Sequence, residues 1–110
     1  SGNPIDTIES TNAKEFENSI NDKINILDVR QVGERNNGYL RNSDHLPLAL
    51  IVSKNKSLNK SLKYYIHCAG GYRSMIACSI LKKNGFDNTI DVEGGFGSIC
   101  NDTSIEILQN

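Results

Sequence analysis

The strongest fold signal in the sequence is Tyr64-Tyr65-Ile66-His67-Cys68-Ala69-Gly70-Gly71-Tyr72-Arg73-Ser74. It opens with the aromatic and β-branched residues of a buried strand, here predicted over 63–67, and breaks at the paired glycines. A helix pattern follows at once over 73–84, with Ile76, Ala77, Ile80 and Leu81 on one face and Gly85 as its stop. A strand that turns directly into a helix is the unit of a parallel α/β sheet. Cys68 is therefore predicted at the carboxyl edge of the sheet, where such folds place their ligands.

Other strand patterns lie on both sides of this unit. After a short extended start near Thr7 and Ile8, the sequence predicts strands over 24–29, 48–52 (entered through Pro47) and 89–92. Strands separated by helical segments favour an α/β fold with a mainly parallel sheet and helices on both faces. The 110 residues suffice for one such domain, with residues 1–4 expected to be a tag remnant or a disordered start.

The connecting segments have weaker patterns. Ser10 and Thr11 offer a cap for a helix through about Ser19. Three further segments follow: a short helix or loop over 31–45, a loop with at most one helical turn over 53–61, and a short tail of helical character over 96–110. Gly94 and Gly95 are best explained by a tight turn that needs glycine backbone angles.

Composition excludes several classes of protein. The formal net charge is −1, with both signs mixed along the chain, so no basic face favours nucleic acid or an anionic membrane. No apolar run is long enough for a membrane span, and no signal segment opens the chain. We therefore expect a cytoplasmic protein without nucleic-acid or membrane partners.

The cysteines point to a working thiol. Cys68, Cys78 and Cys100 are odd in number, lack CxxC spacing, and have no ligand cluster with the two histidines. A disulfide framework and a metal site are both poor interpretations, and a reducing compartment is favoured. Cys78 is expected to be a small core residue of its helix, and Cys100 to be exposed.

The Cys68 loop has the composition of an anion cradle. Gly70 and Gly71 permit positive φ, which lets successive amide N–H groups point into one concavity. The helix start and Arg73 add positive charge at the same place. A cysteine thiol ordinarily titrates at about 8.5, and such surroundings lower that value, so we expect a thiolate at neutral pH. The same cradle would hold a persulfide, with no base needed in the loop.

Cys68-x4-Arg73 after a strand, followed by Ser74 and a helix ending Asn84-Gly85-Phe86, resembles the active-site region of rhodanese-like domains. Other segments resemble motifs of this family in the family's order. They are Leu27-Asp28-Val29-Arg30 with Glu34 downstream, Asp44-His45-Leu46-Pro47-Leu48-Ala49, and Val92-Glu93-Gly94-Gly95.

The resemblance implies a parallel five-stranded sheet flanked by helices on both faces. It also implies sulfur transfer from thiosulfate or a low-molecular-weight persulfide to a thiol or cyanide, with a covalent persulfide on Cys68 and no other cofactor. Arg73 would orient the loop or bind substrate. The loop that binds the sulfur and the donor would comprise Ala69, Gly70, Gly71, Tyr72 and Arg73, and Asp28 and Arg30 would form a supporting charged network.

Several residues keep a plainer interpretation. Asp28 and Arg30 share one side of their strand, so a purely structural ion pair is as good a hypothesis as a role at the site. Strand alternation points His67 away from Cys68, which favours a packed residue over a base, and His45 is expected to be structural. Tyr72 either shields the pocket or contacts the donor.

Two other functions compete. Cysteine phosphatases and arsenate reductases also place a thiolate before an arginine, but their loop encloses five residues, whereas Cys68 and Arg73 enclose four (69–72). A tighter loop suits a single sulfur better than a tetrahedral phosphate. The second alternative is a non-enzymatic rhodanese-like module for binding or regulation, against which the presence of Cys68 argues.

The loop 68–73, Cys-Ala-Gly-Gly-Tyr-Arg, is also similar to that of rhodanese domains fused to metallo-β-lactamase-like persulfide dioxygenases. A chain that starts at Ser1 fits a domain cut from such a fusion. A fused or separate sulfur-metabolism partner is therefore expected.

Overall fold

The computed structural model describes residues 8–20 and 24–109. Thr7 and the expected tag remnant at 1–4 lie outside the described residues. A central sheet of five parallel strands runs in the order β1-β6-β5-β2-β4, which confirms the predicted α/β class. Its strands are β1 (Glu9–Thr11), β2 (Asn25–Asp28), β4 (Ser43–His45), β5 (Tyr64–His67) and β6 (Thr89–Val92).

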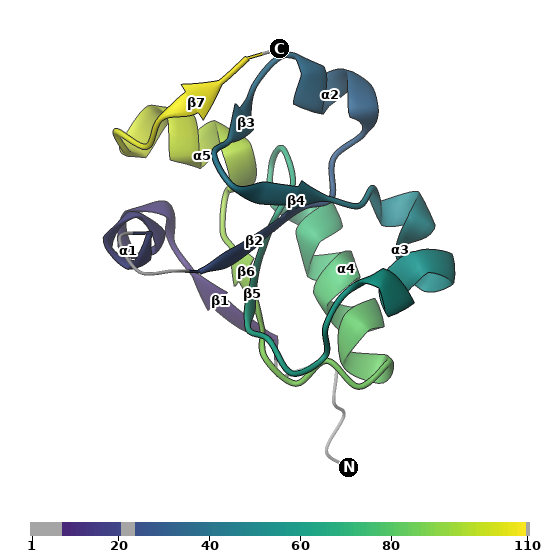
Figure 1. Ribbon diagram of the computed structural model, residues 1–110. Coiled ribbons are helices and arrows are strands. Elements are labelled where there is room, and N and C mark those ends of the chain that lie inside the picture. Colours follow the sequence, from purple (N-terminus) through teal and green to yellow (C-terminus); the bar gives the residue numbers. More distant parts are fainter. Residues whose placement is uncertain (1–7, 21–23, 110) are drawn as a thin grey trace.

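Helices cover both faces of this sheet (Figure 1). One face carries α1 (Ala13–Ser19) and α5 (Gly95–Asp102), and the other carries α3 (Leu48–Lys54) and α4 (Tyr72–Lys83). A short helix, α2 (Val32–Asn36), follows β2. A two-stranded antiparallel pair, β3 (Tyr39–Leu40) with β7 (Ile107–Leu108), lies above α5, and a 3₁₀ turn (Asn55–Ser57) follows α3.

Two apolar clusters, one on each face, form the core. Successive residues of a strand face opposite sides, so Ile66 packs in the cluster beneath α3 and α4, while Tyr65 packs in the cluster beneath α1 and α5. Phe16 of α1 is fully buried and contacts Tyr65, with ring centroids 5.5 Å apart. The two clusters hold β5 at the centre of the sheet, which fixes the position of the residue after it.

The predicted strand over 48–52 is wrong, because Leu48–Lys54 forms helix α3. The strand that pairs with β2 is the preceding polar segment, Ser43–His45, at the edge of the sheet. Pro47 precedes the helix as its cap. A short apolar run does not distinguish a strand from a helix by periodicity, and here Ile51 is buried while Val52 is 70% exposed.

Other boundaries also differ from the predictions. Ser10 and Thr11 pair with β6 in the sheet, so the cap of α1 falls on Asn12, whose Oδ1 accepts a hydrogen bond from the backbone N–H of Glu15 at 2.8 Å. The tail is helical only through Asp102 and ends in β7. On α4 the buried positions include Ala77 and Leu81 as predicted, whereas Ile76 is exposed.

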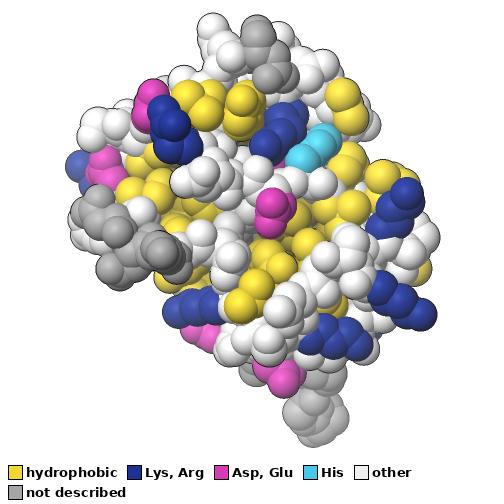
Figure 2. Space-filling model, in the orientation of Figure 1, with side chains coloured by type: hydrophobic (Ala, Val, Ile, Leu, Met, Phe, Trp, Pro, Cys, Tyr) yellow, Lys and Arg dark blue, Asp and Glu magenta, His cyan; other side chains and the backbone are white. Residues whose placement is uncertain are grey.

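Figure 2 shows basic, acidic and apolar side chains together on one face of the molecule. Within the described ranges, no helix has both the length and the apolar character required to cross a membrane.

Candidate functional site: the Cys68 loop

Cys68 is the first residue after β5, the middle strand of the sheet. Its side chain is almost fully buried, at 1% exposure. The backbone N–H of Gly71 donates to the Cys68 sulfur at 3.0 Å, and the Ser74 hydroxyl lies 3.5 Å from the same atom. The sulfur therefore lies where the loop turns into α4, as the sequence predicts.

Gly71 makes the turn possible. It caps the N-terminus of α4 with a left-handed backbone, φ +101°, and a Cβ atom there would lie 3.0 Å from the backbone nitrogen of Gly94. The predicted positive φ is thus confirmed at Gly71, but Gly70 does not have it. One left-handed residue is enough to aim the Gly71 N–H at the sulfur.

Backbone N–H groups at the start of α5 donate hydrogen bonds to carbonyls of the Cys68 loop. The backbone N–H of Phe96 donates to the Cys68 carbonyl at 2.7 Å, and that of Gly97 to the Ala69 carbonyl at 3.0 Å. These two bonds fix the Cys68 and Ala69 carbonyls against the start of α5. Gly95 has φ +57° and lies against both carbonyls, so no side chain fits there. The glycine pair makes the predicted tight turn and also allows this close approach.

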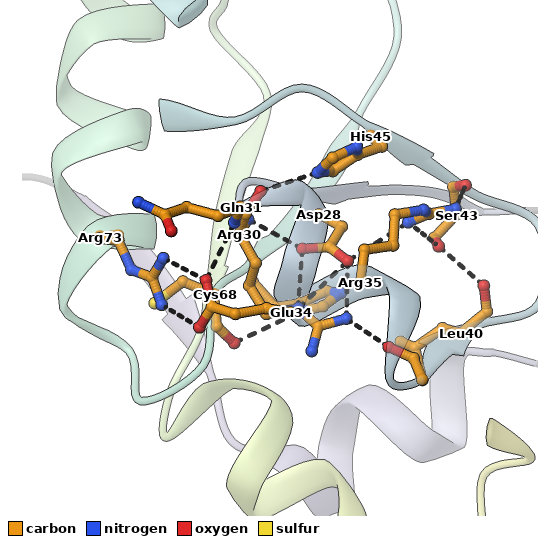
Figure 3. A network of polar contacts seen from close by, with 12 residues as sticks. Asp28, Arg30, Gln31, Glu34, Arg35, Leu40, Ser43, His45, Cys68 and Arg73 are labelled. Atoms are coloured by element: carbon orange, nitrogen blue, oxygen red, sulfur yellow. Dashed lines mark hydrogen bonds and ion pairs between the residues drawn. The ribbon is translucent and has the colours of Figure 1, made fainter. Parts of the chain in front are cut away.

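Arg73 does not point freely into the loop. Its guanidinium forms a bidentate ion pair with Glu34 of α2, with N–O distances of 2.6 and 2.8 Å (Figure 3). The hydrogen bonds from Arg73 lower the pKa of Glu34 to about 2, and the pair in turn raises the pKa of Arg73. Arg73 thus joins the first turn of α4 to α2, and its charge still acts on the nearby Cys68 sulfur.

Asp28 and Arg30 form the predicted charged pair, buried and at 2.9 Å. Arg35 also contacts Asp28, and the Arg30 guanidinium donates to the Gly38 carbonyl (Figure 3). Burial, the largest single influence, would raise the pKa of Asp28, but the hydrogen bonds from Arg30 and the neighbouring positive charges together lower that pKa.

The pair lies on the α5 side of the sheet and reaches the site indirectly. The Arg30 guanidinium stacks 3.9 Å from the Phe96 ring centroid, and the Phe96 N–H holds the Cys68 carbonyl. The geometry shows a buried ion pair that contacts Phe96, and Phe96 in turn contacts the Cys68 loop.

The two histidines occupy structural positions. His67 is fully buried, its ring stacks on Phe96, and burial lowers its pKa to about 4. Its Nε2 has no hydrogen-bond partner within residues 8–20 and 24–109. His45 Nε2 lies 2.7 Å from the Arg30 carbonyl. Both positions agree with the packing roles that the sequence predicts.

The remaining cysteines differ in burial, and Tyr72 is exposed to solvent. Cys78 is buried in α4, where burial raises its pKa to about 12, and Cys100 is exposed on α5. Tyr72 is 76% exposed at the first position of α4, so it does not cover the sulfur.

Sequence reasoning missed Asp91. This residue of β6 is 2% exposed and accepts a hydrogen bond from the Ser74 hydroxyl, which in turn contacts the Cys68 sulfur. Burial raises the pKa of Asp91. A signal was available, since an acidic residue inside a four-residue buried strand needs an explanation.

The fold and site define an α/β domain with a buried cysteine in a loop between the central parallel strand and a helix. The family model described as "Rhodanese-like domain" matches residues 12–102. The chain therefore belongs to the rhodanese-like domain family.

Individual relatives agree with this family. "Putative sulfurtransferase YtwF" of Bacillus subtilis is 33% identical over 86 residues, which cover 78% of this chain and 82% of that protein. "Putative sulfur carrier protein YrkF" of the same organism is 35% identical over 74 residues, covering 67% of this chain but only 40% of that protein. The crystal structure of a rhodanese-related protein from Thermoplasma volcanium superposes with a TM-score of 0.85 at 32% identity, covering 93% of this chain and 99% of that one.

Proposed function

We propose that this domain is a sulfurtransferase that carries a sulfane sulfur as a persulfide on Cys68. One observation carries the proposal: the Gly71 N–H donates to a buried cysteine sulfur at 3.0 Å inside a loop of four residues that Arg73 closes. A backbone donor aimed at sulfur stabilises a thiolate or a persulfide anion more than a neutral thiol.

The first half-reaction is a displacement at sulfur. The Cys68 thiolate attacks the outer sulfur of thiosulfate, a new S–S bond forms, and the old S–S bond breaks with its electron pair leaving on sulfite. A low-molecular-weight persulfide reacts in the same way and releases its thiolate. In the second half, an acceptor thiolate or cyanide takes the outer sulfur, and the electron pair of the S–S bond returns to Cys68.

The loop residues have distinct proposed roles. The Gly71 N–H contacts the sulfur, and Ala69, Gly70 and the exposed Tyr72 are proposed to contact the incoming donor. Arg73 attracts and orients the anionic donor by its charge, even while paired with Glu34. No cofactor other than the Cys68 persulfide is required.

Asp28 and Arg30 support the loop through Phe96. The proposed partners are a small sulfur donor and a thiol acceptor in a reducing, cytoplasmic compartment, since the carrier must be a free thiol. A fused or separate sulfur-metabolism protein is proposed as the source or consumer of the sulfur, and nucleic acid and membranes are not expected to bind.

The decisive experiment is intact mass spectrometry after incubation with thiosulfate or glutathione persulfide. The protein should gain one sulfur that dithiothreitol removes, and Cys68→Ala should abolish the gain while Cys100→Ser, the exposed control, keeps it. Thiocyanate formation from thiosulfate and cyanide should likewise require Cys68.

Each rival function has its own outcome. No mass gain with either donor would leave the non-enzymatic binding module. Robust turnover of a generic aryl phosphate would favour a phosphatase over a sulfurtransferase.

A further inference from the structure

Cys68, Ser74 and Asp91 form a continuous buried chain of polar side chains. The Cys68 sulfur lies 3.5 Å from the Ser74 hydroxyl oxygen, and this hydroxyl is hydrogen-bonded to the Asp91 carboxylate. All three side chains are at most 2% exposed. The sheet register brings them together, because Asp91 pairs with Ile66, two residues before Cys68, on the neighbouring parallel strand.

The hydroxyl at the centre has one proton and three acceptors within reach: the Asp91 carboxylate, the Cys68 sulfur, and the Gly71 carbonyl oxygen at 3.3 Å. When Asp91 is ionised, the Ser74 O–H donates to the carboxylate, and the only donor to the sulfur from the loop is the Gly71 N–H. When Asp91 is protonated, its O–H donates to the Ser74 oxygen, and the Ser74 O–H is free to donate to a sulfur anion, which is a stronger acceptor than the neutral Gly71 carbonyl. The direction of the hydroxyl therefore couples the charge on Asp91 to the charge on Cys68.

Two neighbouring anions in a buried site disfavour each other, so this chain of three side chains holds one negative charge far better than two. We propose that Ser74 and Asp91 form a proton relay for Cys68, in which Asp91 takes up the thiol proton through Ser74 and later returns it.

The step balances without an external reagent. The Cys68 S–H bond breaks as its proton moves to the Ser74 oxygen, and the Ser74 proton moves to Asp91 Oδ1. No electrons are transferred to another group, and the total charge of the three side chains stays −1. When the acceptor removes the outer sulfur and the S–S electron pair returns to Cys68, the same path can return the proton.

Other charged and titratable groups around the relay leave it intact. From α4, Cys78 stays a neutral thiol because burial raises its pKa to about 12. Arg73 is paired with Glu34, and its charge also acts on the Cys68 sulfur at the other end of the relay. Glu93, in the turn just after β6, is exposed and accepts a hydrogen bond from Ser10. Burial, with a smaller contribution from Glu93, raises the pKa of Asp91, which favours its protonated form.

The relay serves sulfur transfer only if Cys68 is the sulfur carrier, so it rests on the proposed function. Its test measures the Cys68 thiolate and not sulfur transfer. The thiolate of Cys68 is followed by ultraviolet absorbance against pH, as the difference between each protein and the same protein with Cys68→Ser. This subtraction removes Cys78, Cys100 and the tyrosines and needs no reagent to reach the buried sulfur.

If the relay shares one proton between the two acids, thiolate should appear in two steps in the unmodified protein. Asp91→Asn keeps the shape but cannot take a proton, so a single step is expected. Ser74→Ala removes the hydroxyl donor and leaves the Gly71 N–H on the sulfur, so it should give a single step at higher pH, and Ser74→Thr should restore two steps. Infrared difference spectra should show a protonated carboxyl band that persists through the first step and is absent in Asp91→Asn.

A single thiolate step in the unmodified protein, unchanged by Asp91→Asn, would overturn the relay. So would an Asp91 carboxyl that is fully ionised before any thiolate appears. Failure to form a persulfide would instead remove the proposed function and leave these titrations as they are.

Discussion

The Arg73 guanidinium and the Glu34 carboxylate meet in two hydrogen bonds of 2.6 and 2.8 Å, and they join α4 to α2 beside the Cys68 loop. About a third of each side chain is exposed, so water screens the pair. The pair therefore adds little to the free energy of unfolding, but it fixes the position of Arg73, the residue that closes the Cys68 loop.

This pair should give a measurable and pH-dependent coupling. A double-mutant cycle with Glu34→Gln and Arg73→Gln should show a coupling of about 0.5–1 kcal/mol at pH 7 by urea unfolding. Because the pKa of Glu34 is lowered from 4.5 to about 2, the stabilisation is complete above 4.5 and is lost as pH falls toward 2. A coupling that stays constant across that range would contradict the role given to Glu34.

Gly95 should not tolerate a side chain. A Cβ atom there would lie 2.8 Å from the Ala69 carbonyl oxygen and still closer to that of Cys68, at a positive φ of 57°. Gly95→Ala should lower the free energy of unfolding by about 3 kcal/mol, through overpacking and backbone strain. Gly97→Ala is the matched control, since its Cβ would lie at an ordinary 3.5 Å from the same Ala69 oxygen. Equal losses in the two variants would refute the close-approach argument.

His67 should make the fold less stable in mild acid. Burial lowers its pKa from 6.5 to about 4, so between these values the unfolded chain binds a proton that the folded chain does not. The free energy of unfolding should therefore fall as pH drops from 6.5 toward 4, by a total on the order of 3 kcal/mol. Urea unfolding of the unmodified protein and of His67→Gln should differ in slope with pH. Parallel pH dependences would show that His67 titrates normally.

Cys78 and Cys100 should differ sharply in reactivity. With its pKa raised to about 12, Cys78 has roughly a thousand-fold less thiolate at pH 8 than an ordinary thiol, and it is buried as well. Peptide mapping after iodoacetamide treatment should show Cys100 modified in the native protein and Cys78 modified only after unfolding. Rapid native labelling of Cys78 would mean that α4 opens readily.

Much of the fold follows from local sequence. The apolar stretch before Cys68, the glycine pair after it and the helix pattern over 73–84 predict a strand, a turn and a helix, and each is present within a residue or two. The local sequence is sufficient to predict this unit, because strand propensity, glycine backbone freedom and helix periodicity all favour a strand, a turn and a helix in that order.

Other features depended on tertiary contacts. Leu48–Lys54 is apolar enough for a strand, but it becomes α3 because Ser43–His45 already occupies the sheet edge beside β2. Only packing decides between two such segments, since each is locally acceptable.

For Cys68, the sequence alone determined its place at a strand end and the donor-rich turn that follows. The tertiary structure decided what surrounds the sulfur: Phe96 holding its carbonyl from α5, Glu34 holding Arg73 from α2, and Asp91 behind Ser74 from β6. These partners are separated from the loop by 17 to 39 residues. They meet only because parallel strands bring their carboxyl ends to one edge, a relationship that no local pattern encodes.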